Sequence, residues 1–157
     1  RNVCEKVANL LKLKALRDAT REHLNAIKEQ LTEDEFQKAL YIIEENSRVL
    51  KAAKMIAENN ILELGKLLFE AHNGAQFQFK ISCEALDFLV EMAKQNPSVI
   101  GARMMGGGFG GCTINIVKKE ELEKYAEEVS EAYRKQFNKE CSVYFIKLSN
   151  GTHIINN

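Results

Sequence analysis

The chain has 157 residues, enough for one domain with a substantial buried core. Apolar residues make up 45% and charged residues 28%, as in ordinary globular proteins. The 22 basic and 22 acidic residues balance, so the sequence predicts no general attraction to nucleic acid or to a membrane surface. It contains no apolar run near the ~20 residues of a membrane span and no visible signal peptide.

The cysteines and histidines do not have the spacing of a metal site. The four cysteines form no CxxC pair, which excludes the common zinc motifs and the density of a secreted disulfide scaffold. The sequence therefore predicts reduced thiols, no metal site and a cytoplasmic location. The chain begins with Arg1 rather than Met, so we expect it to be a fragment. The residues considered are Cys4, Cys83, Cys112, Cys141, His23, His72 and His153.

The first half of the chain has helical periodicity. Apolar residues recur at helical spacing over residues 2–12 and 20–31. Thr32 and Glu35 have the spacing of a capping box, in which each side chain pairs with the other residue's backbone amide. They predict the start of a long helix that runs to about residue 56.

Two further helices are expected before the chain changes character. Asn60 is the expected cap of a helix that continues through Ala71, and Ser82 is the expected cap of a helix over 83–95. Pro97 ends that helix, because proline disfavours helical geometry in the residue before it.

The second half alternates short strands with one more helix. The stretches "SVIGARMM" (98–105), "CTINIV" (112–117) and "CSVYFIKL" (141–148) are rich in residues that favour strands. Residues 119–137 have the pattern of an amphipathic helix. The expected fold is α+β, an antiparallel sheet packed with several helices.

Six of the nine glycines fall within residues 101–111. Gly106, Gly108 and Gly111 match G-x-G-x-x-G, but a strand follows them where a dinucleotide-binding fold needs a helix. No lysine follows, as a Walker A loop requires, and the motifs that accompany a protein-kinase glycine loop are absent. Two interpretations remain: a hairpin whose bare backbone approaches a ligand or binds an anion, and a tight hairpin packed beneath a neighbouring element.

"GARMMGGGFGGCTINIV" (101–117) resembles the third motif of the GHMP small-molecule kinases, in its galactokinase form. Five other stretches occur in the order typical of galactokinase C-terminal halves, so the resemblance spans nearly the whole chain. They are "CEKVANLL" (4–11), "LRDAT" (16–20), "ENSRVLKAA" (45–53), "LGKLLFEAHNG" (64–74) and "ISCEALDFLV" (81–90).

The resemblance implies that residues 1–157 are a GHMP kinase C-terminal domain with ferredoxin-like split βαβ elements, lacking the N-terminal domain. The catalytic base, its arginine partner and the magnesium ligand of these kinases lie in that other half, so the chain is expected to hold no catalytic or metal-binding residue. The glycine loop is expected to lie at the domain interface and to support the phosphate-binding region. The residues carried over for this role are Arg103, Met104, Gly106, Gly107, Gly108, Phe109, Gly110 and Gly111.

The implied activity is transfer of the ATP γ-phosphoryl group to the anomeric hydroxyl of galactose, with magnesium, by the complete enzyme. The fragment alone is expected to be inactive and to need its N-terminal domain as a partner. Three alternatives stay open: a non-catalytic sugar- and ATP-sensing regulator, a kinase for a uronic acid or N-acetylgalactosamine, and a freestanding interaction module.

Three further side chains have competing interpretations. Arg103 offers either a fixed cation for phosphate or an ion pair with the N-terminal domain. His72 is expected to help cap the end of its helix rather than act as a base. Asp87 is expected to face solvent or make a structural bond.

Overall fold

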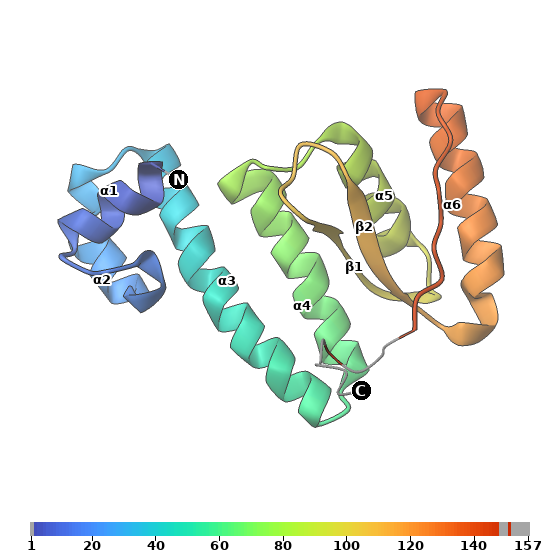
Figure 1. The fold of residues 1–157 in the computed structure, drawn as a ribbon, viewed down its shortest axis with the longest axis horizontal. Helices are drawn as coiled ribbons and strands as arrows, with labels where there is room; N and C mark the ends of the chain where they lie inside the picture. Colours follow the sequence, from blue (N-terminus) through green and yellow to red (C-terminus); the bar gives the residue numbers. More distant parts are fainter. Residues whose placement is uncertain (1, 148–150, 152–157) are drawn as a thin grey trace, which may run out of the picture.

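The computed structural model describes residues 2–147 and residue 151 (Figure 1). Helices occupy the chain up to Gln95, and a hairpin of two strands separates them from the last helix. The long elements are α1 (Asn2–Leu10), α2 (Arg21–Ala26), α3 (Glu33–Ala57), α4 (Ile61–Gly74), α5 (Glu84–Gln95), β1 (Val99–Met105), β2 (Cys112–Val117) and α6 (Leu122–Phe137). Shorter 3-10 turns lie at Leu16–Asp18, Lys28–Gln30 and Lys119–Glu121, and a π-helical turn lies at Ala75–Phe79.

The N-terminal helices form a cluster at one end of the molecule. α1 and α2 pack against the first part of α3, and their apolar side chains are removed from water there (Figure 1). The buried residues of this cluster are Val7, Leu16, Ala19, Leu24, Ile27, Phe36, Ala39 and Leu40.

The predicted caps at the starts of α3 and α4 are confirmed. The hydroxyl of Thr32 accepts from the N–H of Glu35 at 3.2 Å, and the Glu35 carboxylate accepts from the N–H of Thr32 at 3.0 Å. The side-chain oxygen of Asn60 accepts from the N–H of Glu63 at 3.2 Å. These bonds satisfy amides that have no partner within the helix, and they fix where each helix begins.

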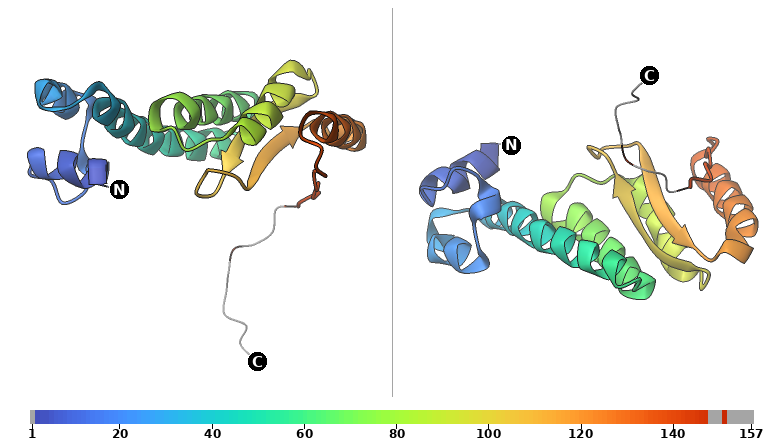
Figure 2. Two further views of the ribbon diagram at one scale, coloured as in Figure 1. Left: turned by 90° about the horizontal axis from the view of Figure 1, so that it is seen from above. Right: turned by 60° about the horizontal axis from the view of Figure 1, so that its bottom comes forward.

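The sheet consists of β1 and β2, paired antiparallel with Ala102 opposite Asn115 and Met105 opposite Cys112. Figure 2 shows α4 and α5 together on one face of this hairpin, while no described helix covers the other face. α6 packs beside α5, where Tyr125 and Val129 join a buried cluster with Val90. The predicted α+β fold with an antiparallel sheet is confirmed.

Two glycines let α4 approach β1 very closely. A Cβ on Gly65 would overlap the carbonyl of Ile100, and a Cβ on Gly101 would overlap the backbone of Gly65. Backbone contact of this kind is open only to residues without a side chain. The helix and the strand that leads into the glycine loop are therefore held together tightly.

Several expected boundaries need correction. The first helix ends at Leu10 rather than residue 12, because Lys12 adopts a left-handed conformation with φ of 56°. The stretch 20–31 forms α2 and a separate 3-10 turn instead of one helix. The residue preceding α5 is Cys83, which makes no side-chain cap, and the Ser82 hydroxyl is buried without a hydrogen-bond partner.

The expected last strand does not form either. Residues 141–147 pair with no strand in the described part of the chain, and residue 148 lies outside it, as does His153. Cys4, Cys83, Cys112 and Cys141 form no disulfide with one another in this structure. Among the helices that the structure describes, none combines the length and the apolar character needed to cross a membrane.

Candidate functional site

Residues 106–111 form the loop that joins β1 to β2, at the surface of the molecule. Gly106, Gly108, Gly110 and Gly111 have φ angles of 90°, 85°, 140° and 100°. Side chains are strained at such angles, so the path of the loop requires glycine at these four positions. No residue of the loop is buried, so it does not pack beneath a neighbouring element.

Gly107 differs from the other glycines of the loop. Its φ lies outside the left-handed region, and a Cβ built on it would meet no atom within 4 Å. Neither the backbone nor the packing of the described residues therefore requires glycine here. The backbone of Gly107 is therefore accessible to a ligand or to another protein segment that is not among the described residues.

The other side of the loop is fastened to the segment that precedes α5. The N–H of Phe109 donates to the carbonyl of Ile81 at 2.7 Å, and a Cβ on Gly108 would overlap the same carbonyl. The loop is thus held at its base while its outer backbone stays accessible.

Phe109 combines an uncommon backbone conformation with an exposed ring. Its φ is 57°, and its side chain is 75% exposed. A bulky residue with positive φ costs about 1–2 kcal/mol relative to an ordinary conformation. Such strain is typical of functional segments that the surrounding structure holds in place.

A buried histidine holds β1 just before the loop. His72 is 1% exposed, and its Nδ1 accepts from the N–H of Met104 at 3.2 Å. The proton of the neutral ring therefore lies on Nε2, which is 3.2 Å from Oδ1 of Asp87. Burial lowers the pKa of His72, and this effect outweighs the Asp87 carboxylate, which raises it. The side chain links α4, α5 and β1 and does not cap its own helix.

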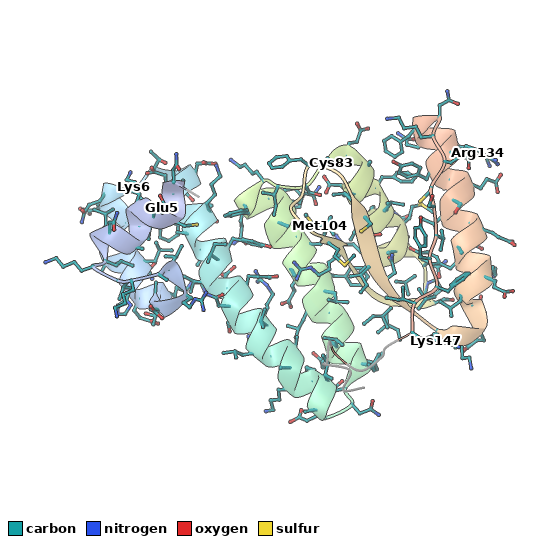
Figure 3. The ribbon with its side chains drawn as sticks, in the orientation of Figure 1. Glu5, Lys6, Cys83, Met104, Arg134 and Lys147 are labelled. Carbon is teal, nitrogen blue, oxygen red and sulfur yellow. The ribbon has the colours of Figure 1, made fainter. Side chains whose placement is uncertain are left out.

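Met104 itself points into the protein. It is 2% exposed and belongs to a buried cluster with Tyr41 and Leu86, which Cys83 borders (Figure 3). It can therefore influence the loop through the position of β1, and its side chain does not line the loop surface.

Arg103 is paired within this chain. Its Nη1 lies 2.6 Å from Oε1 of Glu45, and Arg48 Nε lies 2.8 Å from the other oxygen of the same carboxylate. Burial alone would raise the pKa of Glu45, but hydrogen bonds from Arg48 and Arg103 lower it below its ordinary value. The charge of Arg103 thus ties β1 to α3, and it does not point at the loop as a free cation.

The eight predicted site residues therefore fall into two groups. The loop residues 106–111 lie at the surface, exposed or partly exposed, whereas Arg103 and Met104 anchor the strand behind them. Sequence reasoning missed Ile81, Glu45 and the bridging role of His72. The partners of Ile81, Glu45 and His72 are Phe109, Arg103 and Met104, which lie 28, 58 and 32 residues away in the sequence. A local sequence pattern cannot indicate contacts between residues so far apart. Asp87 lies in contact with His72, and such a structural contact was one of the two roles expected for it.

The described residues contain no group of three or more His, Cys, Asp or Glu side chains that fits a metal ion.

Comparison with known proteins gives the context of the loop. A model described as "GHMP kinases C terminal" matches residues 8–135. Proteins named galactokinase are similar over 99% of this chain: those of Thermotoga neapolitana, at 37% identity, and Clostridium beijerinckii, at 36%. The chain covers 43% and 41% of their lengths.

A solved structure is similar as well. The crystal structure of Lactococcus lactis galactokinase complexed with galactose matches 92% of this chain with a TM-score of 0.84 and 27% identity. The chain covers 37% of that protein. With the family match extending over most of its residues, the chain belongs to the GHMP kinases and carries their C-terminal domain.

Proposed function

We propose that the chain is the C-terminal part of a galactokinase, which transfers the γ-phosphoryl group of ATP to the anomeric hydroxyl of galactose. The product would be galactose 1-phosphate. Support comes from the relatives named galactokinase, which match the chain from end to end, and from the galactokinase structure that shares its fold. Since the chain spans well under half of those proteins, the activity belongs to the complete polypeptide.

The loop 106–111 is proposed to support the phosphates of ATP at the boundary with the N-terminal domain. The observation that carries this role is Gly107, a glycine that the described structure does not itself require. Phosphoryl transfer depends on positioned groups more than on covalent help from the protein, so a surface without side chains allows two domains to close tightly around ATP.

Arg103 and Met104 are proposed to act from behind the loop. Glu45 neutralises the Arg103 guanidinium, and the Met104 amide is held by His72. Both residues would fix the end of β1 and thereby the start of the loop. They position the site and do not touch the phosphate.

The groups that perform the chemistry are proposed to lie in the N-terminal domain. The described residues offer no metal cage, and the loop contains no side chain that can accept a proton. Residues 1–157 alone should therefore bind no magnesium at the loop and phosphorylate no sugar.

The test is a coupled assay of ADP release by the full-length polypeptide with galactose, galacturonic acid and N-acetylgalactosamine. We expect galactose-dependent release, with phosphate attached at the anomeric carbon in the phosphorus NMR spectrum of the product. Binding of galactose and ATP without turnover would identify a regulator instead. Faster turnover of another sugar would contradict the proposed substrate, and sugar-dependent ADP release by residues 1–157 alone would contradict the placement of the chemistry.

A further inference from the structure

The chain between α4 and α5 has an unusual backbone where it passes the glycine loop (Figure 1). Residues 75–81, here called the support segment, begin with the π-helical turn Ala75–Phe79, after which Lys80 adopts a left-handed conformation with φ of 59°. The N–H of Ile81 donates to the carbonyl of Ala75 at 3.0 Å and closes the turn. π-Helical turns are rare and frequently lie at functional sites, so this one points to a role beyond linking two helices.

The support segment carries the group that fastens the loop. The carbonyl of Ile81 accepts from the N–H of Phe109 at 2.7 Å, and a Cβ on Gly108 would overlap the same carbonyl. The position of this one carbonyl therefore limits where the loop can lie. Contacts that hold the support segment in place also hold the loop.

Two polar side chains tie the support segment to α3. Lys80 Nζ lies 2.6 Å from Oδ1 of Asp34, and the Gln78 amide donates to Oε2 of Glu44 at 3.2 Å. Hydrogen bonds from Lys38 and Lys80 lower the pKa of Asp34, so the carboxylate is charged at neutral pH and keeps the ion pair. The partners are 46 and 34 positions apart in the sequence, so the two ties fix one element against another.

An aromatic contact lies between the two ties. The ring centroid of Phe79 is 5.1 Å from that of Tyr41 on α3, and Tyr41 is buried. This contact holds one point of the support segment against α3. The ties at Gln78 and Lys80, on either side of it in the sequence, restrict how the segment can turn about that point.

We propose that Lys80 and Gln78 are positioning residues for the phosphate-supporting loop. They hold the Ile81 carbonyl in place relative to α3, and that carbonyl keeps the loop in one conformation. The inference rests on the function proposed for the loop. Lys80 and Asp34 are partly exposed, and exposed ion pairs contribute little to the free energy of unfolding, so the ties act on local opening of the loop and not on whether the chain folds.

The test compares two double variants of the full-length polypeptide. Gln78→Ala/Lys80→Gln removes both ties. The control, Gln37→Ala/Lys38→Gln, removes an amide and a lysine that are bonded within α3. The Gln37 amide donates to another α3 side chain at 2.7 Å, and Lys38 Nζ lies 2.6 Å from the second oxygen of Asp34. The control therefore loses bonds of the same kinds that do not reach the support segment.

Amide hydrogen exchange of the peptide that contains Phe109 measures the hold on the loop. Loss of both ties should raise the exchange rate of the Phe109 amide at least about fivefold, because its acceptor is no longer fixed, and the control should leave the rate unchanged. Lys80→Arg alone should also leave it unchanged, because arginine can keep the ion pair.

Galactose-dependent ADP release measures the consequence for the reaction. Gln78→Ala/Lys80→Gln should lower kcat by about fivefold and leave the KM for galactose unchanged, since the loop is proposed to support the phosphates and not the sugar. The thermal midpoint is measured on the same samples. If it falls, Lys80→Gln alone is compared with Lys38→Gln by the same criteria.

The two measurements separate the inference from the function on which it rests. Equal exchange rates of the Phe109 amide in the two double variants would overturn the inference, and so would faster exchange with an unchanged kcat. If the unaltered polypeptide releases no ADP with galactose, the proposed function fails by itself. The exchange comparison then still decides the hold on the loop, which faster exchange in Gln78→Ala/Lys80→Gln alone would support.

Discussion

The N–H of Phe109 donates a hydrogen bond of 2.7 Å to the carbonyl of Ile81. This bond fastens the glycine loop to the segment that leads into α5. It holds the loop in place on one side and leaves its other side accessible. Each variant is to be measured in the full-length polypeptide.

Gly108→Ala should destabilise the fold. The added Cβ would overlap the Ile81 carbonyl, and φ of 85° is unfavourable for alanine. We expect the free energy of unfolding to fall by about 2–3 kcal/mol, measured by denaturant titration. An unchanged midpoint would show that the loop is not fastened to Ile81.

Phe109→Gly should separate stability from activity. Glycine removes the strain of φ at 57°, so the thermal midpoint should not fall, while loss of the exposed ring should reduce kcat/KM by about tenfold or more through poorer placement of the loop. Lys12→Gly is a matched control, because Lys12 has φ of 56° far from the loop along the chain and is exposed. The control should leave kcat/KM unchanged, and equal effects of the two variants would contradict the role of Phe109.

The stability of the fold should decrease as the pH falls below about 6.5. In the folded protein, burial keeps the pKa of His72 below its ordinary value of 6.5, so the ring stays neutral while the unfolded chain takes up a proton. The free energy of unfolding therefore falls from pH 6.5 down to the folded pKa and then levels off. Asp34 and Glu35 have lowered pKa values and titrate below this range.

His72→Gln should flatten this pH dependence and cost about 1–3 kcal/mol at pH 7.5, where the bond to the Met104 amide is weakened. His23→Gln is the control for replacing an exposed histidine with glutamine, since glutamine can keep the hydrogen bond that the His23 ring accepts from the N–H of Thr20. Thermal unfolding between pH 5 and 8 measures both. A slope that survives His72→Gln would assign the pH dependence to other groups.

Glu45→Ala should cost more than the loss of a surface ion pair. It leaves Arg103 and Arg48 without a shared carboxylate 2.6 Å and 2.8 Å away, so we expect a loss of about 1–3 kcal/mol. Glu131→Ala removes an exposed pair with Lys135 and should change stability by less than about 0.5 kcal/mol. Comparable losses in the two variants would show that the ion pair between Arg103 and Glu45 adds no more to stability than an exposed pair.

Local sequence patterns were enough to predict many of the helices and the hairpin of this fold. Thr32 with Glu35 and Asn60 marked helix starts correctly, because capping depends on residues three positions apart. The hairpin followed from two β-rich stretches around glycines. Two expectations from local sequence were wrong: Ser82 does not cap α5, and residues 141–147 form no strand although their residue types favour one.

The candidate site shows the same division. The loop residues were recognisable as a glycine-rich motif, but the partners of Arg103 and Met104 were not, because α3 and α4 bring Glu45 and His72 to β1 only in three dimensions. Gly65 inside a helix was a usable signal, since an isolated helical glycine often marks close packing.

The most direct test of the central claim is Gly107→Ala in the full-length polypeptide, with the thermal midpoint and galactose-dependent ADP release measured on the same preparation. Since a methyl group at this position meets no atom of the described chain, the midpoint should stay unchanged while kcat/KM falls at least about tenfold. Unchanged midpoint and unchanged turnover would contradict the claim that ATP and the second domain close over this loop.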